Sequence, residues 1–268
     1  MMRADVHIHS SFSHDSTSSP EEMILGAIGK KLEMICFTDH YDKDNMDWGP
    51  EDIFDPEAYF RELRALQYKY KDQIEVRIGV EIGIQPYLAP YYKEFVQTYA
   101  FDFVIGSVHS VRRSDIALGK IYDLYADEEI QRMAFEETLE NVKVNDSFDV
   151  LGHMDYIVRY GSLREKIYSY RKYEDLIDET LKILIEKGKG LELNMAGLKY
   201  GLSFAHPHPD ILKRYRELGG EIITVGSDGH RPKHLAYDFY KAGSILKDCG
   251  FTYYTEFRER KPVFKRLA

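Results

Sequence analysis

Residues 55–82 read DPEAYFRELRALQYKYKDQIEVRIGVEI, and this stretch joins a helix signal to an apolar run. Asp55-Pro56 predicts a helix start, because aspartate can cap free amide groups and proline suits the first helical position. The run from Val76 to Ile82 has the length and the branched apolar residues of a buried strand. A helix followed by such a strand is one unit of an α/β fold, and this alternation recurs along the chain.

The apolar runs predict a barrel of parallel strands. They are Ala4 to His7, Met34 to Thr38, Val76 to Ile82, Phe103 to Val108, Val150 to Gly152, Leu191 to Asn194 and Ile222 to Gly226. Seven strands alternating with helices indicate the α/β class and a TIM-like (β/α)7 barrel. Because α/β barrels of about 250 residues form one domain, we expect residues 1–268 to be a single domain.

Helix signals lie between the predicted strands. Ser19-Pro20-Glu21-Glu22 combines a cap, an initial proline and a capping-box glutamate. Further helix-period patterns cover Asp127 to Asn145, Tyr173 to Lys187, Pro209 to Leu218 and Lys233 to Lys247, with Gly188 and Gly219 as expected stops. The long irregular stretch from Tyr41 to Phe54 contains the only tryptophan, Trp48, and is typical of either an active-site lid or a solvated loop.

Composition limits the classes of partner. The 268 residues are 44% hydrophobic and 30% charged, with a formal net charge of −9, which predicts a folded protein and disfavours nucleic acid as a partner. No apolar run is long enough to span a membrane, and MMRADVHIHS lacks the apolar core of a secretory signal, so we expect a cytoplasmic protein. Cys36 and Cys249 have no C-x-x-C spacing and are expected to be reduced thiols.

Histidines and carboxylates gather where the predicted strands end. They are His7, His9, His40, Glu81, His109, His153, Asp228 and His230. In a βα barrel the C-terminal ends of the strands converge on one face, which predicts a metal site there. Residues i and i+2 of a strand share a face, so His7 and His9 can chelate one ion, as can Asp228 and His230. Imidazole combined with carboxylate suits zinc, iron or manganese.

Each of these residues also has a simpler structural explanation. A lone histidine is more often a core or surface residue, but many titratable groups buried together favour metal coordination. Glu81 stands in the apolar run Ile78-Gly79-Val80-Glu81-Ile82, which favours a bridging carboxylate over a salt bridge. Asp15, within Ser13-His14-Asp15-Ser16, is a ligand or part of a turn. His206-Pro207-His208-Pro209 is a further metal pair or, as its prolines favour, a rigid turn.

Six ordered motifs resemble those of the PHP superfamily, named for polymerase and histidinol phosphatase. They are Asp5-x-His7-x-His9, Thr38-Asp39-His40, Gly79-x-Glu81, Ser107-Val108-His109, Gly152-His153 and Ser227-Asp228-x-His230. The match covers nearly the whole chain. Within the superfamily, the sequence is most similar to stand-alone histidinol-phosphate phosphatases. The resemblance implies a distorted (β/α)7 barrel with a trinuclear metal centre at the C-terminal ends of its strands.

The resemblance also implies a ligand set for three divalent ions. His7, His9, Glu81 and Asp228 would hold the first. Glu81 would bridge to the second, completed by His109 and His153. The third would be held by Asp15, His40 and His230.

The implied reaction is hydrolysis of a small phosphate monoester, L-histidinol phosphate, to L-histidinol and inorganic phosphate in histidine biosynthesis. Two ions that share Glu81 can lower the pKa of a water molecule and produce a hydroxide that attacks phosphorus. Asp228 and His230 belong to this catalytic set. No nucleophilic side chain is required.

Arg159 and Trp48 are expected to bind the substrate. Arg159, just beyond His153, can clamp two phosphate oxygens, although a surface charge on a helix explains it equally well. Arg112 and Arg113 are weaker candidates. The acidic stretch around Trp48, with Asp42, Asp44, Asp47 and Asp52, could recognise the ammonium and imidazole of histidinol phosphate.

Other functions fit the same sequence. A PHP phosphoesterase acting on phosphotyrosine, nucleotides or sugar phosphates would use the same metal site. A metal-stabilised binding module without turnover, or an aldolase-like or deaminase barrel, belongs to a different class. Release of inorganic phosphate from a generic ester separates these classes.

Overall fold

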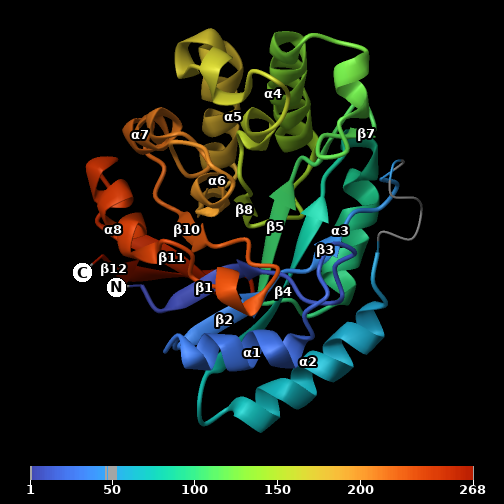
Figure 1. Cartoon of the computed structure of the whole chain (residues 1–268), viewed down its shortest axis with the longest axis vertical. Coiled ribbons are helices and arrows are strands. Elements are labelled where there is room, and N and C mark those ends of the chain that lie inside the picture. The colour runs from blue at the N-terminus through green and yellow to red at the C-terminus, as the bar shows by residue number, and fades with distance from the viewer. Residues whose placement is uncertain (1, 46, 48–52, 268) are drawn as a thin grey trace.

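Parallel strands form a nearly closed barrel in the computed structural model, which describes residues 2–45, 47 and 53–267. Hydrogen-bonded neighbours follow the order β1-β2-β4-β5-β8-β9-β10, and β3 (His40–Tyr41) also pairs with β4. The other strands are β1 Ala4–Ile8, β2 Met34–Phe37, β4 Glu75–Gly83, β5 Phe103–Ser107, β8 Val150–Leu151, β9 Gly190–Asn194 and β10 Ile223–Gly226. The barrel closes where Ile8 bridges Gly229, beyond β10, and Figure 1 shows helices outside the strands.

This architecture confirms the expected α/β barrel. Every strand predicted from an apolar run is present, and its ends differ from the prediction by no more than one residue. All residues of these seven strands are buried except Glu75 at the start of β4. Strands covered on both faces are continuous apolar runs rather than alternating patterns, which is why they could be recognised in the sequence.

A C-terminal hairpin closes the N-terminal end of the barrel. Its strands are β11 (Tyr253–Arg258) and β12 (Lys261–Arg266), which pair antiparallel. The ring of Phe257 stacks on Phe103, the first residue of β5, with centroids 5.0 Å apart. Phe257 joins a small core formed by the first residues of several strands. The hairpin was not predicted, and it leaves the opposite end of the barrel for the functional site.

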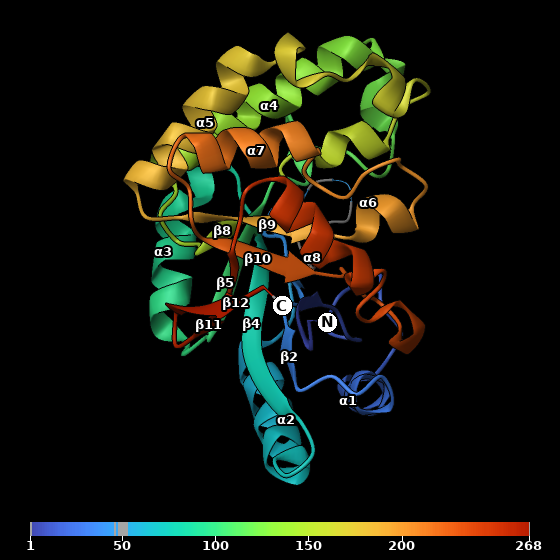
Figure 2. The ribbon, with the colours of Figure 1, turned by 90° about the vertical axis from the view of Figure 1, so that its left-hand side faces the viewer.

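Helices cover the outside of the barrel, and capping signals explain where the first two begin. They are α1 Pro20–Gly29, α2 Pro56–Tyr70, α3 Ala89–Thr98, α4 Asp127–Val144, α5 Glu174–Glu186, α6 Ala196–Lys199, α7 Pro209–Glu217 and α8 Phe239–Asp248. Ser19 and Glu22 form the expected capping box, and Asp55 caps α2 through the amide of Glu57. Helix α3 was not predicted. Figure 2 shows α4, α5 and α7 side by side over β8, β9 and β10.

The predicted start of the last helix was wrong. A helix from Lys233 was expected, but α8 begins at Phe239, and Pro232–His234 forms only a 3-10 turn. The backbone is left-handed at Ala236 (φ 48°) and Asp238 (φ 53°), which a continuous helix excludes. The buried carboxylate of Asp5 accepts the amide hydrogen of Ala236 at 2.7 Å. This tertiary bond therefore holds the chain in a turn where the local pattern favours a helix.

The connection from β8 to α5 is long and mostly irregular. It contains the 3-10 turns Tyr156–Arg159, Arg164–Ile167 and Tyr170–Lys172. The first two contribute side chains to the cavity at the C-terminal ends of the strands. Within the described part of the chain, none of the helices has the length and apolar character needed to cross a membrane.

Candidate metal centre

Glu81, near the end of β4, lies at the middle of a buried histidine cluster. Its side chain is fully buried. Oε2 lies 3.2 Å from His7 Nε2, 3.6 Å from His9 Nε2 and 3.0 Å from His40 Nδ1. Asp228, beyond β10, adds Oδ1 at 3.4 Å from His9 Nε2. One carboxylate oxygen thus faces His7 in β1, His9 just beyond β1 and His40 in β3.

The second oxygen of Glu81 faces the other side of the cluster. Oε1 lies 3.4 Å from His109 Nε2 and 2.9 Å from His153 Nε2. The hydroxyl of Ser107 also donates to Oε1 at 2.6 Å. Because the two oxygens serve different histidines, Glu81 is placed as a carboxylate shared between two sites.

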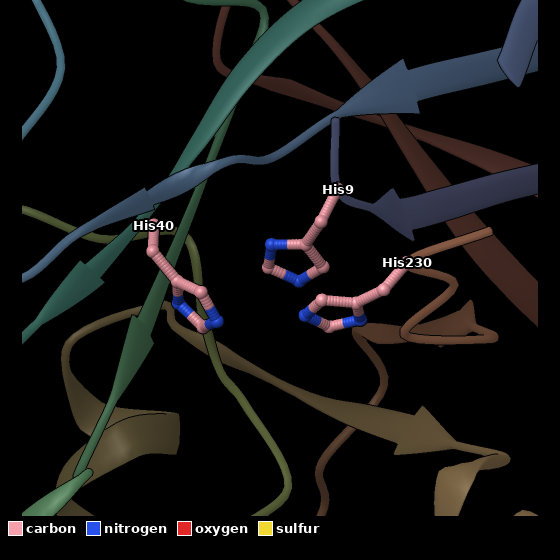
Figure 3. Close-up of side chains that lie close together, drawn as sticks. All are labelled: His9, His40 and His230. Carbon is pink, nitrogen blue, oxygen red and sulfur yellow. The ribbon is translucent and has the colours of Figure 1, made fainter. Parts of the chain in front are cut away.

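A third group lies on the open side of the cluster. Figure 3 shows the rings of His9, His40 and His230 facing one another, and the rings of His9 and His230 stack with centroids 4.1 Å apart. Asp15 places Oδ2 2.9 Å from His230 Nε2 and Oδ1 3.8 Å from His40 Nε2. The structure therefore brings together every residue of the expected ligand set.

The spacing of these atoms fits divalent ions. Ligand atoms about 2.1 Å from one tetrahedral ion lie about 3.4 Å from each other, close to the separations around Glu81. Among the described residues, four groups of ligand atoms are able to hold an ion: His7, His9 and Glu81; Glu81, His109 and His153; His9, His40 and His230; and His40, Asp42 and His109. The Nε2 atoms of His7, His9 and His230 and Oε2 of Glu81 are buried without a hydrogen-bond partner. Buried polar atoms are rarely left unpaired, so this pattern supports metal coordination.

The charges of the carboxylates suit cation binding. Burial opposes ionisation of Glu81, but His7, His109 and His40 hold its pKa well below its usual range. Burial also opposes ionisation of Asp228, whereas the imidazole of His9, 3.4 Å away, and the charge of His7 hold its pKa well below its usual range. Both carboxylates are therefore ionised at neutral pH and can bind cations without first losing a proton.

Sequence reasoning missed the acidic residues that contact the far nitrogens of two histidines. Glu192 Oε1 lies 2.6 Å from His7 Nδ1, and Asp42 Oδ2 lies 2.6 Å from His109 Nδ1. Glu192 is a charged residue within the buried strand β9, the same signal that identified Glu81. Asp42 gave no such signal, because it stands among other acidic residues in the irregular stretch after β3.

Arg159 lies beside the histidine cluster, on the wall of a cavity of about 340 Å³. Its guanidinium carbon is 4.5 Å from the ring centroid of Tyr156, 5.1 Å from that of Tyr160 and 4.2 Å from that of Tyr200. One amino group donates to the Tyr160 hydroxyl at 2.7 Å, and the other is buried without a partner. Arg159 is therefore not a surface charge on a helix. It places an unpaired cationic donor near the candidate metal ligands.

The weaker arginine candidates lie elsewhere. Neither Arg112 nor Arg113 lines this cavity. The guanidinium of Arg112 instead lies over the ring of Tyr125, 5.1 Å from its centroid, and donates to the Tyr125 hydroxyl at 2.7 Å. Arg113 lies over the ring of Tyr87.

The structure alters part of the expectation that the acidic stretch around Trp48 recognises the substrate. Trp48 and Asp52 lie outside the described residues. The Asp47 carboxylate accepts from Lys120 at 2.6 Å and from Ser114 at 3.1 Å, so its charge is already paired. Asp42 lines the cavity, but one of its oxygens is bound to His109.

The remaining histidine pair belongs to a turn, as its prolines favoured. His206 is fully buried, and its Nδ1 lies 2.5 Å from Asp155 Oδ1. His208 caps α7 by accepting the amide hydrogen of Asp210. Neither histidine is in any of the metal-binding groups found among the described residues. Cys36 and Cys249 are free and buried, as expected.

A βα barrel with clustered imidazoles and carboxylates at the C-terminal ends of its strands defines the class of metal-dependent barrel hydrolases. Comparison with known proteins narrows the class. The PHP domain model matches residues 5–196, and the chain belongs to the PHP domain family.

Similar proteins cover almost the whole chain. The histidinol-phosphatase of Lactococcus lactis is 33% identical over 94% of this chain and 93% of its own length. A protein of Clostridium acetobutylicum named probable histidinol-phosphatase is 34% identical over 98% of this chain and 97% of its own. The crystal structure of the Lactococcus lactis histidinol phosphate phosphatase contains zinc, L-histidinol and phosphate. It matches with a TM-score of 0.86 and 32% identity, covering 97% of this chain and 98% of that chain.

Proposed function

We propose that the protein is a histidinol-phosphatase that hydrolyses L-histidinol phosphate to L-histidinol and inorganic phosphate, as in histidine biosynthesis. The observation that carries the proposal is the buried cluster around Glu81, which opens into a cavity beside the unpaired donor of Arg159. The similarity to the Lactococcus lactis enzyme, solved with zinc, L-histidinol and phosphate, supports the choice of ester.

The residues around Glu81 would hold three divalent ions, in the division that the resemblance to PHP phosphatases implies. His7, His9, Glu81 and Asp228 would hold the first. Glu81, His109 and His153 would hold the second, and Asp15, His40 and His230 the third. The contacts of Glu81 support this division, because Oε2 faces His7 and His9 whereas Oε1 faces His109 and His153.

Bound ions would supply an activated water as nucleophile and would neutralise charge on the phosphate oxygens. The protein's own side chains position the ester. Arg159 donates to phosphate oxygens, and the rings of Tyr156, Tyr160 and Tyr200 hold its guanidinium at the cavity wall. Although burial disfavours its charge, Tyr156, Tyr160 and the charge of Asp228 hold the pKa of Arg159 above its usual range, so the guanidinium stays charged and can bind an anion. A planar guanidinium can hold two oxygens of one phosphate.

The cavity suits a small ester. Its volume of about 340 Å³ is at the lower end of the range for small-molecule sites. Tyr156, Tyr160 and Tyr200 provide aromatic surface against which an imidazole can pack, and Asp115 provides an acidic group that also lines the cavity. These features support an amino alcohol with an aromatic ring as the leaving group.

Domain organisation and location are part of the same proposal. Residues 1–268 form a single PHP-type domain, since β10 and the residues beyond it, including Asp228 and His230, complete the barrel and its cluster. The protein acts in the cytoplasm, where its two cysteines would remain reduced.

Substrate preference tests the choice of ester. We expect kcat/KM for L-histidinol phosphate to exceed that for phosphotyrosine and for sugar phosphates by on the order of 10²-fold or more, about 2.7 kcal/mol. The metals and Arg159 contact only the shared phosphate, so the remainder of the ester must determine preference. From the sequence alone, Trp48→Ala is expected to narrow the difference.

The comparison is made side by side on metal-loaded protein, with phosphate release as the readout. Equal or better efficiency with phosphotyrosine would defeat the choice of L-histidinol phosphate and leave a phosphatase of another ester. No release from any ester would favour the binding module.

A further inference from the structure

Glu192, in the middle of β9, contacts both sides of the candidate metal centre. It is fully buried. Oε1 lies 2.6 Å from Nδ1 of His7, while Oε2 accepts the backbone amide of His153 at 3.1 Å. The amide group of Asn194 donates to the same Oε2 at 3.1 Å. His7 and His153 face different oxygens of Glu81. Glu192 therefore contacts one expected ligand of each of two ions.

We propose that Glu192 and Asp42 are positioning residues that fix the orientation and tautomer of His7 and His109 for metal binding. The inference rests on the proposed function only in that the centre holds metal. A carboxylate at Nδ1 accepts the ring hydrogen there and leaves Nε2 unprotonated, as ligation requires. In both histidines Nε2 is the nitrogen that faces Glu81.

The pair formed by Glu192 and His7 is closely packed against strand β10. A Cβ atom added at Gly226, on the neighbouring strand β10, would lie 2.3 Å from His7 Cβ and 2.5 Å from Glu192 Oε1. Only a residue without a side chain therefore fits beside the pair. Such close packing is characteristic of a support that holds a ligand in one orientation.

Glutamine cannot replace Glu192 without loss, although it has the same shape. Wild-type Glu192 accepts hydrogen bonds on both oxygens, whereas an amide has one acceptor and one donor. If the amide nitrogen faced His7, the ring hydrogen would move to Nε2 and block ligation. If the amide nitrogen instead faced the backbone amide of His153 and the side chain of Asn194, these buried N–H donors would lose their acceptor. The free energy of unfolding would then fall.

Asp155 offers a matched control. It is fully buried and also accepts from one histidine, His206 Nδ1 at 2.5 Å, and from one backbone amide, that of His208 at 2.7 Å. His206 is in none of the metal-binding groups of the described residues. Asp155→Asn therefore removes a similar pair of bonds in which none of the expected ligands takes part.

The test measures metal affinity without substrate. Wild type, Glu192→Gln, Asp42→Asn and Asp155→Asn are stripped of metal, checked by circular dichroism and titrated with Zn²⁺ against a chelator of known affinity. We expect Glu192→Gln and Asp42→Asn to bind about 10- to 100-fold more weakly and Asp155→Asn to stay within about twofold of wild type. Excess Zn²⁺ should restore much of the lost kcat in the first two variants, which loss of folded protein would not allow.

The outcomes separate this inference from the choice of substrate. Wild-type Zn²⁺ affinity in Asp42→Asn would overturn the proposal, even if Glu192→Gln failed to fold. An equal loss of affinity in Asp155→Asn would also overturn it, because general packing would then explain the effect. A wrong substrate would change none of these affinities.

Discussion

Glu81→Ala is expected to lower kcat by on the order of 10³-fold or more and to remove most of the bound metal. The two oxygens of Glu81 face separate histidine groups, so its loss removes a ligand shared between two ions. Metal ions lower the activation free energy of such a reaction by several kcal/mol. A change of about 4 kcal/mol in that barrier corresponds to a 10³-fold change in rate. Metal content by elemental analysis and steady-state phosphate release provide the two readouts.

A carboxylate at the other end of the same strand serves as the control for Glu81. Glu75 begins β4 and pairs with Arg77 at 2.7 Å, far from the histidine cluster. Glu75→Gln should leave metal content and kcat close to wild type. Full metal occupancy and normal turnover in Glu81→Ala would show that the proposed centre is wrong.

Arg159→Ala is expected to lower kcat/KM by on the order of 10²- to 10³-fold while leaving metal content unchanged. Removing one member of a buried charged pair costs about 2 to 5 kcal/mol. Arg159 lines the cavity, and its guanidinium donates to the hydroxyl of Tyr160 rather than to a candidate metal ligand. Arg159→Lys should recover only part of the loss, because an ammonium cannot hold two oxygens in the planar geometry of a guanidinium.

Arg112→Ala is the matched control for Arg159, because Arg112 also lies over a tyrosine ring but outside the cavity. Its kinetics should resemble those of wild type. Unchanged kcat/KM in Arg159→Ala would mean that Arg159 supports the tyrosines around it without binding phosphate. Loss of metal in that variant would instead indicate disruption of the site.

The barrel could be predicted because its strands are buried on both faces. Continuous apolar runs such as Val76 to Ile82 then mark each strand to within one residue. The expected ligands were visible for the same reason, since His7 or Glu81 is conspicuous at the end of an apolar run. Convergence of the strand ends brings these residues together, although they are far apart in the sequence.

Features that depend on tertiary contacts were not predicted. The start of α8 is set by the bond between Asp5 and the amide of Ala236, which local periodicity cannot indicate. The role of Asp42 depends on its 2.6 Å contact with His109, a residue distant in the sequence. The amphipathic pattern of α3 was overlooked, and the exposed strand β12 lacks the apolar run that identified each barrel strand.

Metal-dependent release of phosphate from L-histidinol phosphate is the most direct measurement. The protein is assayed as loaded, after removal of metal confirmed by elemental analysis, and after reloading with Zn²⁺ or Mn²⁺. We expect removal to lower the rate by on the order of 10³-fold and reloading to restore it, since bound ions supply the nucleophile. Metal-free protein that turned over L-histidinol phosphate at the loaded rate would contradict a metal-dependent histidinol-phosphatase.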